Sequence, residues 1–110
     1  MKEEIELEKE EYTFEETKIF FDHLEIFKNS NKIKLIEKIL KFLEEIKENP
    51  KKGTGKPEAL KHYGERDVWS RRINDEHRLV YEIFTEIKVV KLLSAYGHYN
   101  EKKKDKNTLF

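Results

Sequence analysis

The stretch "WSRRINDEHRLVY", residues 69–81, decides the fold that we predict for this chain. Apolar and polar residues alternate on both sides of "NDE", a short connection of the kind that joins antiparallel strands. We therefore expect a β-hairpin. Four of its thirteen residues are nevertheless Arg or His, and cationic side chains are costly to bury. Either one face of the hairpin is simply solvated, or it presents its cations to an anionic partner.

Outward from the hairpin, the alternation predicts three antiparallel strands, at about 67–73, 77–84 and 87–96. The links "NDE" and "TE" are short enough for tight turns. Within the middle strand, Leu79, Tyr81 and Ile83 fall on one face and Arg78 on the other. We therefore expect a sheet with helices on one face and a concave surface on the other.

Two amphipathic helices are predicted before these strands, at about 15–30 and 32–49, with a turn at "NSN" between them. Pro50 ends the second helix. The apolar residues at helical spacing, which we expect to be buried, are Ile19, Phe20, Leu24, Phe27, Ile33, Ile36, Ile39, Leu40, Leu43 and Ile46. Residues 4–14 alternate weakly and predict an edge strand. The expected class is α+β: an N-terminal strand, a helical hairpin and then an antiparallel β-sheet.

Composition excludes several classes of protein. At 110 residues the chain has room for one domain with a modest core. It has no Cys, which excludes disulfides, thiolate metal sites and cysteine nucleophiles. No apolar run could span a bilayer, and the start "MKEEIELEKEEY" is too acidic for a signal or transit peptide. We expect a soluble cytoplasmic protein without membrane association.

The zero net charge conceals an asymmetry between the two halves. Residues 1–49 contain 9 Lys or Arg and 14 Asp or Glu, whereas residues 50–110 contain 14 and 9. The basic half includes the hairpin, which suggests an anionic partner, although ordinary solvated charge explains the same count. We expect a single domain over 1–110, with its core at about 12–99, an acidic extension at 1–11 and a basic tail at 100–110.

Several residues of the second half suit the cleavage of an RNA phosphodiester. A carboxylate and an imidazole could serve as general base and general acid, guanidinium groups could stabilise the phosphorane, and aromatic rings could stack on a base. This chemistry needs no metal or cofactor, and no spacing of metal ligands recurs in the chain. The candidates are Glu58, Arg71, Arg72, Arg78, Tyr96, His98 and Tyr99.

The same residues also fit ordinary structural roles. Glu58 follows Pro57 and could cap a helical turn. Arg71 and Arg72 are adjacent and point to opposite faces, so at least one is expected at the surface or in an ion pair. His77, at the start of a strand, is expected to be structural. The residues alone therefore leave the site open.

The motifs "GKPEALKH", "VWSRRINDEHRLVYEI" and "SAYGHY" occur in this order over residues 53–99, and together they closely resemble the YoeB/Txe family of bacterial toxins, within the RelE/ParE superfamily. Residues 12–50 match that family only in pattern. The resemblance implies a RelE-like microbial RNase fold. It also implies a toxin that enters the ribosomal A site and cleaves mRNA by 2′-hydroxyl attack, leaving a 2′,3′-cyclic phosphate and a free 5′-hydroxyl.

Carried over by motif, Glu58 would be the general base and His98 the general acid. Arg78 would stabilise the transition state, and Tyr99 would position the substrate or assist the acid. The substrate-binding cations would be Lys61, Arg72 and Arg71. The residues of the hairpin that would face the core are Trp69, Ile73, Leu79 and Tyr81.

The resemblance also implies partners: a cognate antitoxin, the 70S ribosome with its mRNA, operator DNA only through the toxin–antitoxin complex, and a possible homodimer. Two alternatives stay open. One is a toxin of the same fold that inhibits gyrase without cleaving RNA, and the other is an inactive module that only binds its antitoxin and represses.

Overall fold

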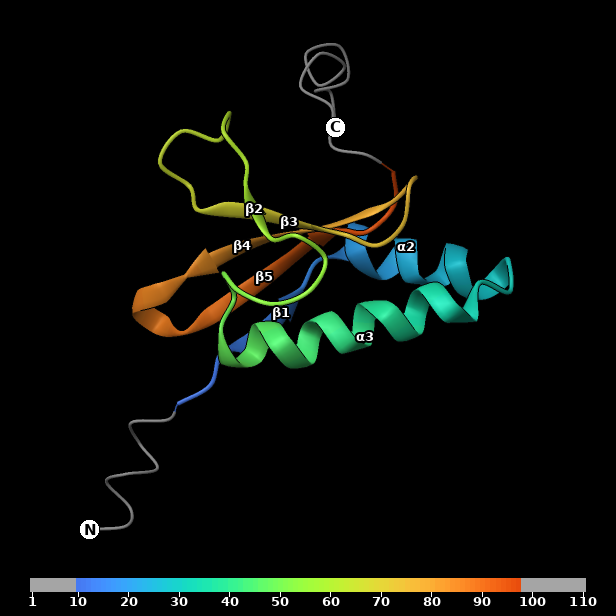
Figure 1. Ribbon diagram of the computed structural model, residues 1–110, viewed down its shortest axis with the longest axis horizontal. Helices are drawn as coiled ribbons and strands as arrows, with labels where there is room; N and C mark the ends of the chain where they lie inside the picture. Colours follow the sequence, from blue (N-terminus) through green and yellow to red (C-terminus); the bar gives the residue numbers. More distant parts are fainter. Residues whose placement is uncertain (1–9, 98–110) are drawn as a thin grey trace, which may run out of the picture.

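The 69–81 stretch forms the predicted hairpin at the centre of a five-stranded sheet in the computed structural model, which describes residues 10–97 (Figure 1). The elements, in chain order, are β1 (Thr13–Glu16), α2 (Lys18–Asn29), α3 (Ile33–Glu48), β2 (Glu58–Ala59), β3 (Val68–Arg72), β4 (Arg78–Phe84), the 3-10 turn η1 (Thr85–Ile87) and β5 (Val89–Ser94). The predicted α+β class is confirmed.

The sheet has the strand order β1-β5-β4-β3-β2, and all its pairs are antiparallel except β1 with β5. An edge strand is present at Thr13–Glu16, but it overlaps the predicted range 4–14 only at residues 13–14 and extends into the start of the predicted helix; residues 4–9 lie outside the described part. The last strand begins at Val89, later than expected, because η1 and the left-handed Lys88 (φ 56°) form a longer connection than a two-residue turn.

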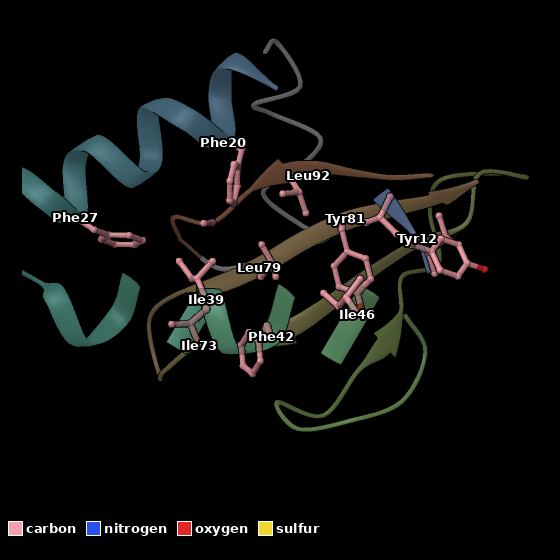
Figure 2. Packing of buried hydrophobic residues seen from close by; sticks show 13 residues of the cluster. Tyr12, Phe20, Phe27, Ile39, Phe42, Ile46, Ile73, Leu79, Tyr81 and Leu92 are labelled. Atoms are coloured by element: carbon pink, nitrogen blue, oxygen red, sulfur yellow. The ribbon is translucent and has the colours of Figure 1, made fainter. Parts of the chain in front are cut away.

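Both helices lie on the same side of the sheet (Figure 1). Their buried side chains meet Leu79 and Tyr81 of β4 in one core (Figure 2). The helical residues buried there are Phe20, Phe27, Ile39, Phe42 and Ile46. Full burial of each such side chain contributes about 1.5–3 kcal/mol, so this layer accounts for much of the stability of the fold.

The prediction that all the periodic apolar residues of the helices are buried was wrong for three of them. Ile19, Ile33 and Leu40 are each about half exposed, Leu40 by 54%. Leu24, Ile36 and Leu43 lie at the margin of the core and are partly buried. The apolar stripe of each helix is therefore wider than the surface that the sheet covers.

The start of α2 is tied directly to the sheet. The Thr17 hydroxyl accepts a hydrogen bond from the Phe20 amide (3.1 Å) and donates one to the Leu92 carbonyl (2.8 Å). It therefore caps the helix and fixes its first turn against β5. None of the helices within residues 10–97 has both the length and the hydropathy needed to cross a bilayer.

The expected alternation of the hairpin is confirmed. Ile73, Leu79 and Tyr81 are buried in the core. Trp69 packs on the core and is half-buried, and its indole donates a hydrogen bond to Asp67 (2.8 Å). Ser70, Arg72 and Arg78 alternate with these residues and therefore point to the face that the helices leave uncovered.

Arg71 does not hold the expected substrate-binding position, because it points into the helix-covered layer and its exposed fraction is 0%. Its guanidinium donates to Glu45 Oε1 (2.7 Å), the Tyr81 hydroxyl (3.0 Å) and the carbonyls of Thr54 (3.1 Å) and Lys52 (2.6 Å). A buried arginine needs such saturation of its donors. Arg71 is therefore a clamp on the loop that follows α3.

Glu45 completes this clamp. Partial burial by itself would raise the pKa of Glu45, but hydrogen bonds from Thr54 and the charge of Arg71 outweigh burial and lower the pKa below its ordinary value. Folding therefore favours the ionised carboxylate. Its stabilisation is complete above the unfolded-chain pKa of about 4.5 and is lost as the pH falls through the lower pKa of the folded state.

We predict that Arg71→Ala lowers the free energy of unfolding by about 3–5 kcal/mol, because it leaves a partly buried carboxylate and several carbonyls without their donor. Urea denaturation followed by circular dichroism measures this change. Arg72→Ala is the matched control, since it removes only an exposed ion pair with Asp75, worth at most about 1 kcal/mol. Equal stability of the two variants would contradict the clamp.

We further predict that Glu45→Gln flattens the acid limb of the stability curve. Wild-type protein should lose stability as the pH falls below about 4.5, because the Glu45 carboxylate takes up a proton on unfolding. The glutamine variant should be less stable at pH 7 and converge on wild type in acid. A constant difference between the two proteins from pH 7 to pH 3 would show that Glu45 does not titrate with unfolding.

Candidate active site

The face of the sheet opposite the helices carries a cleft of about 570 Å³. Strand pairing sets its geometry: Glu58 of β2 lies opposite Ser70 of β3, and Arg72 of β3 lies opposite Arg78 of β4. Directly paired residues point to the same face. The residues that line the cleft are Glu58, Ala59, Leu60, Lys61, His62, Ser70 and Arg78.

Glu58 reaches the cleft on a very short edge strand. The Leu60 amide donates to the Val68 carbonyl (2.8 Å), and the Arg72 amide donates to the Gly55 carbonyl (2.7 Å). Gly55 has φ 81°, and a Cβ atom there would lie 2.6 Å from the ring of Phe42. The loop therefore packs closely against the core at Gly55, three residues before Glu58. Glu58 belongs to a strand, so the capping alternative does not apply.

The charged groups of the cleft differ from those elsewhere on this face. Arg66 forms a two-point ion pair with Glu82 (2.8 and 3.1 Å). Within residues 10–97, by contrast, neither the Glu58 carboxylate nor the Arg78 guanidinium forms an ion pair. Both groups keep their hydrogen-bonding capacity for a ligand.

Two guanidinium groups face each other at the end of the hairpin. Arg72 and Arg78 are a directly opposed cross-strand pair, and like charges in such a pair are unfavourable. Asp75 in the connecting turn bonds to Arg72 and offsets part of this charge. An anion between the two side chains would remove the remaining repulsion and would accept the paired donors of each guanidinium.

Sequence reasoning missed Ser70, which lines the cleft beside Glu58. Ser70 is 2% exposed, and its hydroxyl forms no side-chain hydrogen bond within the described residues. Leaving a buried hydroxyl without a hydrogen-bond partner costs about 1–3 kcal/mol of stability. Because the Ser70 hydroxyl is already removed from water in the folded protein, a ligand in the cleft could accept its hydrogen bond without a further desolvation cost. The signal was in "WSRRI", where period-two alternation puts Ser70 on the same face as Arg72.

Of the remaining predicted residues, one lies in the cleft and two cannot be placed. Lys61 lines the cleft with Glu58, as expected from the motif "KPEALK". His98 and Tyr99 lie outside the described residues. Gly97, to which His98 is bonded, is anchored at both ends, since its carbonyl accepts from the Arg78 amide (3.0 Å) and its amide donates to His77 Nδ1 (2.9 Å).

Tyr96 does not line the cleft; its ring stacks on Phe27 (centroids 5.7 Å apart) and contacts His77 (4.6 Å). In residues 10–97, no three His, Asp or Glu side chains are grouped so that they could hold a metal ion. The chemistry that the described residues offer is that of a carboxylate, cations and a hydroxyl around an open cleft.

Comparison with known proteins identifies the family of the chain. The family model for the YoeB-like toxin of bacterial type II toxin-antitoxin systems matches residues 15–99. Toxin YoeB of Escherichia coli (strain K12) is 44% identical over 50 residues, which are 46% of this chain and 58% of that toxin. The chain thus matches less than two thirds of the length of this relative.

Solved structures match over a longer span. The YoeB/ParE toxin from Agrobacterium tumefaciens superposes with a TM-score of 0.71 and 31% identity, over 79% of this chain and 99% of that one. YoeB from Staphylococcus aureus, solved as a dimer, gives 0.69 and 35% over 80% and 98%. The same toxin in a heterotetrameric complex with YefM gives 0.65 and 35% over the same shares. By sequence and by fold, the chain belongs to the YoeB-like toxins of bacterial type II toxin-antitoxin systems.

Proposed function

We propose that this toxin is a ribosome-dependent endoribonuclease that cleaves mRNA in the A site by metal-independent general acid–base catalysis. The observation that carries the proposal is the cleft in which Glu58 and Arg78, both without an ion pair in the described part of the chain, stand around one open space. A surface that only binds a partner has no need of an uncompensated carboxylate among cations. Cleavage by 2′-hydroxyl attack uses both groups, one as the base for the hydroxyl proton and the other to stabilise charge on the phosphorane.

In the proposed reaction, Glu58 removes the proton from the 2′-hydroxyl of the nucleotide before the scissile bond. The 2′-oxygen attacks phosphorus, and Arg78 stabilises the negative charge that develops on the phosphorane oxygens. The bond from phosphorus to the 5′-oxygen then breaks, and His98 donates a proton to that oxygen. The products are a 2′,3′-cyclic phosphate and a free 5′-hydroxyl, and Tyr99 positions the substrate or assists His98.

The residues that we expect to bind the substrate lie on the face of the sheet that carries the cleft. Lys61, which lines the cleft with Glu58, and Arg72, which lies opposite Arg78 on the same face, would bind the phosphates on either side of the scissile bond or nearby ribosomal RNA. Ser70 would donate its hydroxyl proton to a non-bridging phosphate oxygen. Arg71 is left out of this set, because its guanidinium is buried on the other face.

The proposal extends to partners and to the whole chain. The S. aureus relative forms a complex with YefM and also a dimer. We expect this toxin to bind a cognate antitoxin, to contact operator DNA only through that complex and to be able to form a homodimer in the cytoplasm. The toxin domain would occupy about residues 12–99, flanked by the acidic segment 1–11 and the basic segment 100–110.

Primer extension on a defined mRNA, with and without 70S ribosomes, tests the activity. We predict cuts at A-site codons that require ribosomes and that fall about 100- to 10,000-fold in rate in Glu58→Ala and in His98→Gln, because each removes a proton-transfer group. Circular dichroism should show unchanged helical content in both variants. Loss of helix would mean that these residues are structural. No cuts by wild-type protein would favour gyrase inhibition or a purely repressive role.

A second prediction concerns Arg78. Arg78→Ala should cleave about 100- to 1,000-fold more slowly at saturating ribosome concentration, because the phosphorane loses its guanidinium donor. Arg78→Lys should recover only part of this loss, since an ammonium group cannot make the two-point contact. Lys41→Ala, which removes an equal charge from the exposed surface of α3, is the control and should cleave like wild type. Full activity of Arg78→Ala would exclude the assigned role.

A further inference from the structure

The chain beyond the last strand is held by two histidine side chains. β5 ends at Ser94, and the next three amides all donate to imidazole nitrogens. Ala95 and Tyr96 donate to His23 Nδ1 (3.0 and 3.2 Å), and Gly97 donates to His77 Nδ1 (2.9 Å). The two rings thus take the place of a neighbouring strand in the segment that leads directly to His98.

These histidines come from different layers of the fold. His23 lies on α2, and His77 immediately precedes β4. The Tyr96 ring lies close to both, with centroid distances of 5.7 Å to His23 and 4.6 Å to His77. Phe27 contacts His77 edge to face at 5.0 Å. The segment 95–97 is therefore fixed where the helical layer, the hairpin and β5 meet.

The hydrogen bonds specify the protonation state of both rings. An Nδ1 atom that accepts carries no proton, so each ring is neutral with its proton on Nε2. His77 Nε2 lies 3.6 Å from the Glu76 carboxylate, which suits that tautomer. Burial lowers the pKa of His23; Asp22 opposes this shift, and His77 adds to it. His23 thus stays neutral, and available as an acceptor, at neutral pH.

Gly97 sets the direction in which the chain leaves this anchored segment. Its φ of 88° lies in the left-handed region, which favours glycine, so the chain turns sharply there. Its amide is held by His77 and its carbonyl by the backbone of Arg78. The position from which the chain continues to His98 is therefore set relative to Arg78, a residue of the cleft.

We propose that His77 and His23 are positioning residues for the reaction: as neutral Nδ1 acceptors they fix residues 95–97, the segment from which the chain continues to the proposed general acid His98. This inference rests on the proposed function for its kinetic consequence. The anchoring itself is a property of the fold and can be measured without any activity.

Two substitutions of His77 separate the acceptor from the ring. His77→Phe keeps an aromatic ring against Phe27 and Tyr96 but has no acceptor, whereas His77→Asn keeps an oxygen near the position of Nδ1. Amide hydrogen exchange by NMR should show Gly97 exchanging at least about 10-fold faster in His77→Phe than in His77→Asn. Equal exchange of Gly97 in the two variants overturns the anchor.

Cleavage on 70S ribosomes then tests positioning. In His77→Phe, kcat should fall about 10- to 100-fold with KM unchanged, because a small misplacement of a catalytic group is costly while substrate contacts remain. His77→Asn should stay within about threefold of wild type. Equal kcat in the two variants overturns the positioning role.

His23 provides an independent pair, since it is only half-buried and its substitution perturbs the core less. His23→Phe should speed exchange of the Ala95 and Tyr96 amides and lower kcat, and His23→Asn should restore both. If wild-type protein never cleaves mRNA while these exchange differences are found, the proposed function fails and the anchor stands. If wild type cleaves and neither phenylalanine variant differs from its asparagine partner, the inference fails alone.

Discussion

The buried guanidinium of Arg71 is the interaction on which the rest of this structure depends. It joins Glu45 of α3, the loop carbonyls that follow and Tyr81 of β4, so one side chain links the helical layer, the loop and the sheet. The loop has no regular structure of its own between α3 and β2, and its polar backbone needs internal donors where it packs onto Phe42. The clamp fixes the loop that leads to Glu58, and the backbone bonds of Gly55 with Arg72 and of Leu60 with Val68 then hold Glu58 at the edge of β3.

One face of the hairpin stabilises the fold, and the other face carries the residues of the cleft. Arg71 and Arg72 are consecutive, yet the first is buried and saturated while the second lies on the open face opposite Arg78. On that face, Arg66 and Glu82 neutralise each other away from the cleft. The cleft itself keeps a carboxylate, a guanidinium and a buried hydroxyl without such pairing in the described residues. That contrast is what a site for an anionic, reactive ligand requires.

The segment after β5 is held by side chains rather than by strand pairing on one side. In the proposed reaction the general acid follows directly after residues 95–97, so this segment needs fixed anchors beyond the last paired residue of β5. Here His23 and His77 act as acceptors in place of a strand, and Gly97 turns the chain beside Arg78. Two elements distant in sequence, α2 and the start of β4, therefore converge on the segment that precedes His98.

By itself, the sequence determined the α+β class, the two helices, the hairpin and the face on which Arg78 lies, because these follow from local periodicity and turn chemistry. Its motifs also predicted that Glu58 and Lys61 lie together, and both line the cleft. Tertiary structure alone decided that Arg71 is buried and that Ser70 lines the cleft. It also decided that Ile19 and Leu40 stay exposed and that β1 pairs in parallel with β5. The physical reason is the same in each case. Period-two and helical patterns say which residues share a face, but what covers that face depends on contacts between residues far apart in the chain.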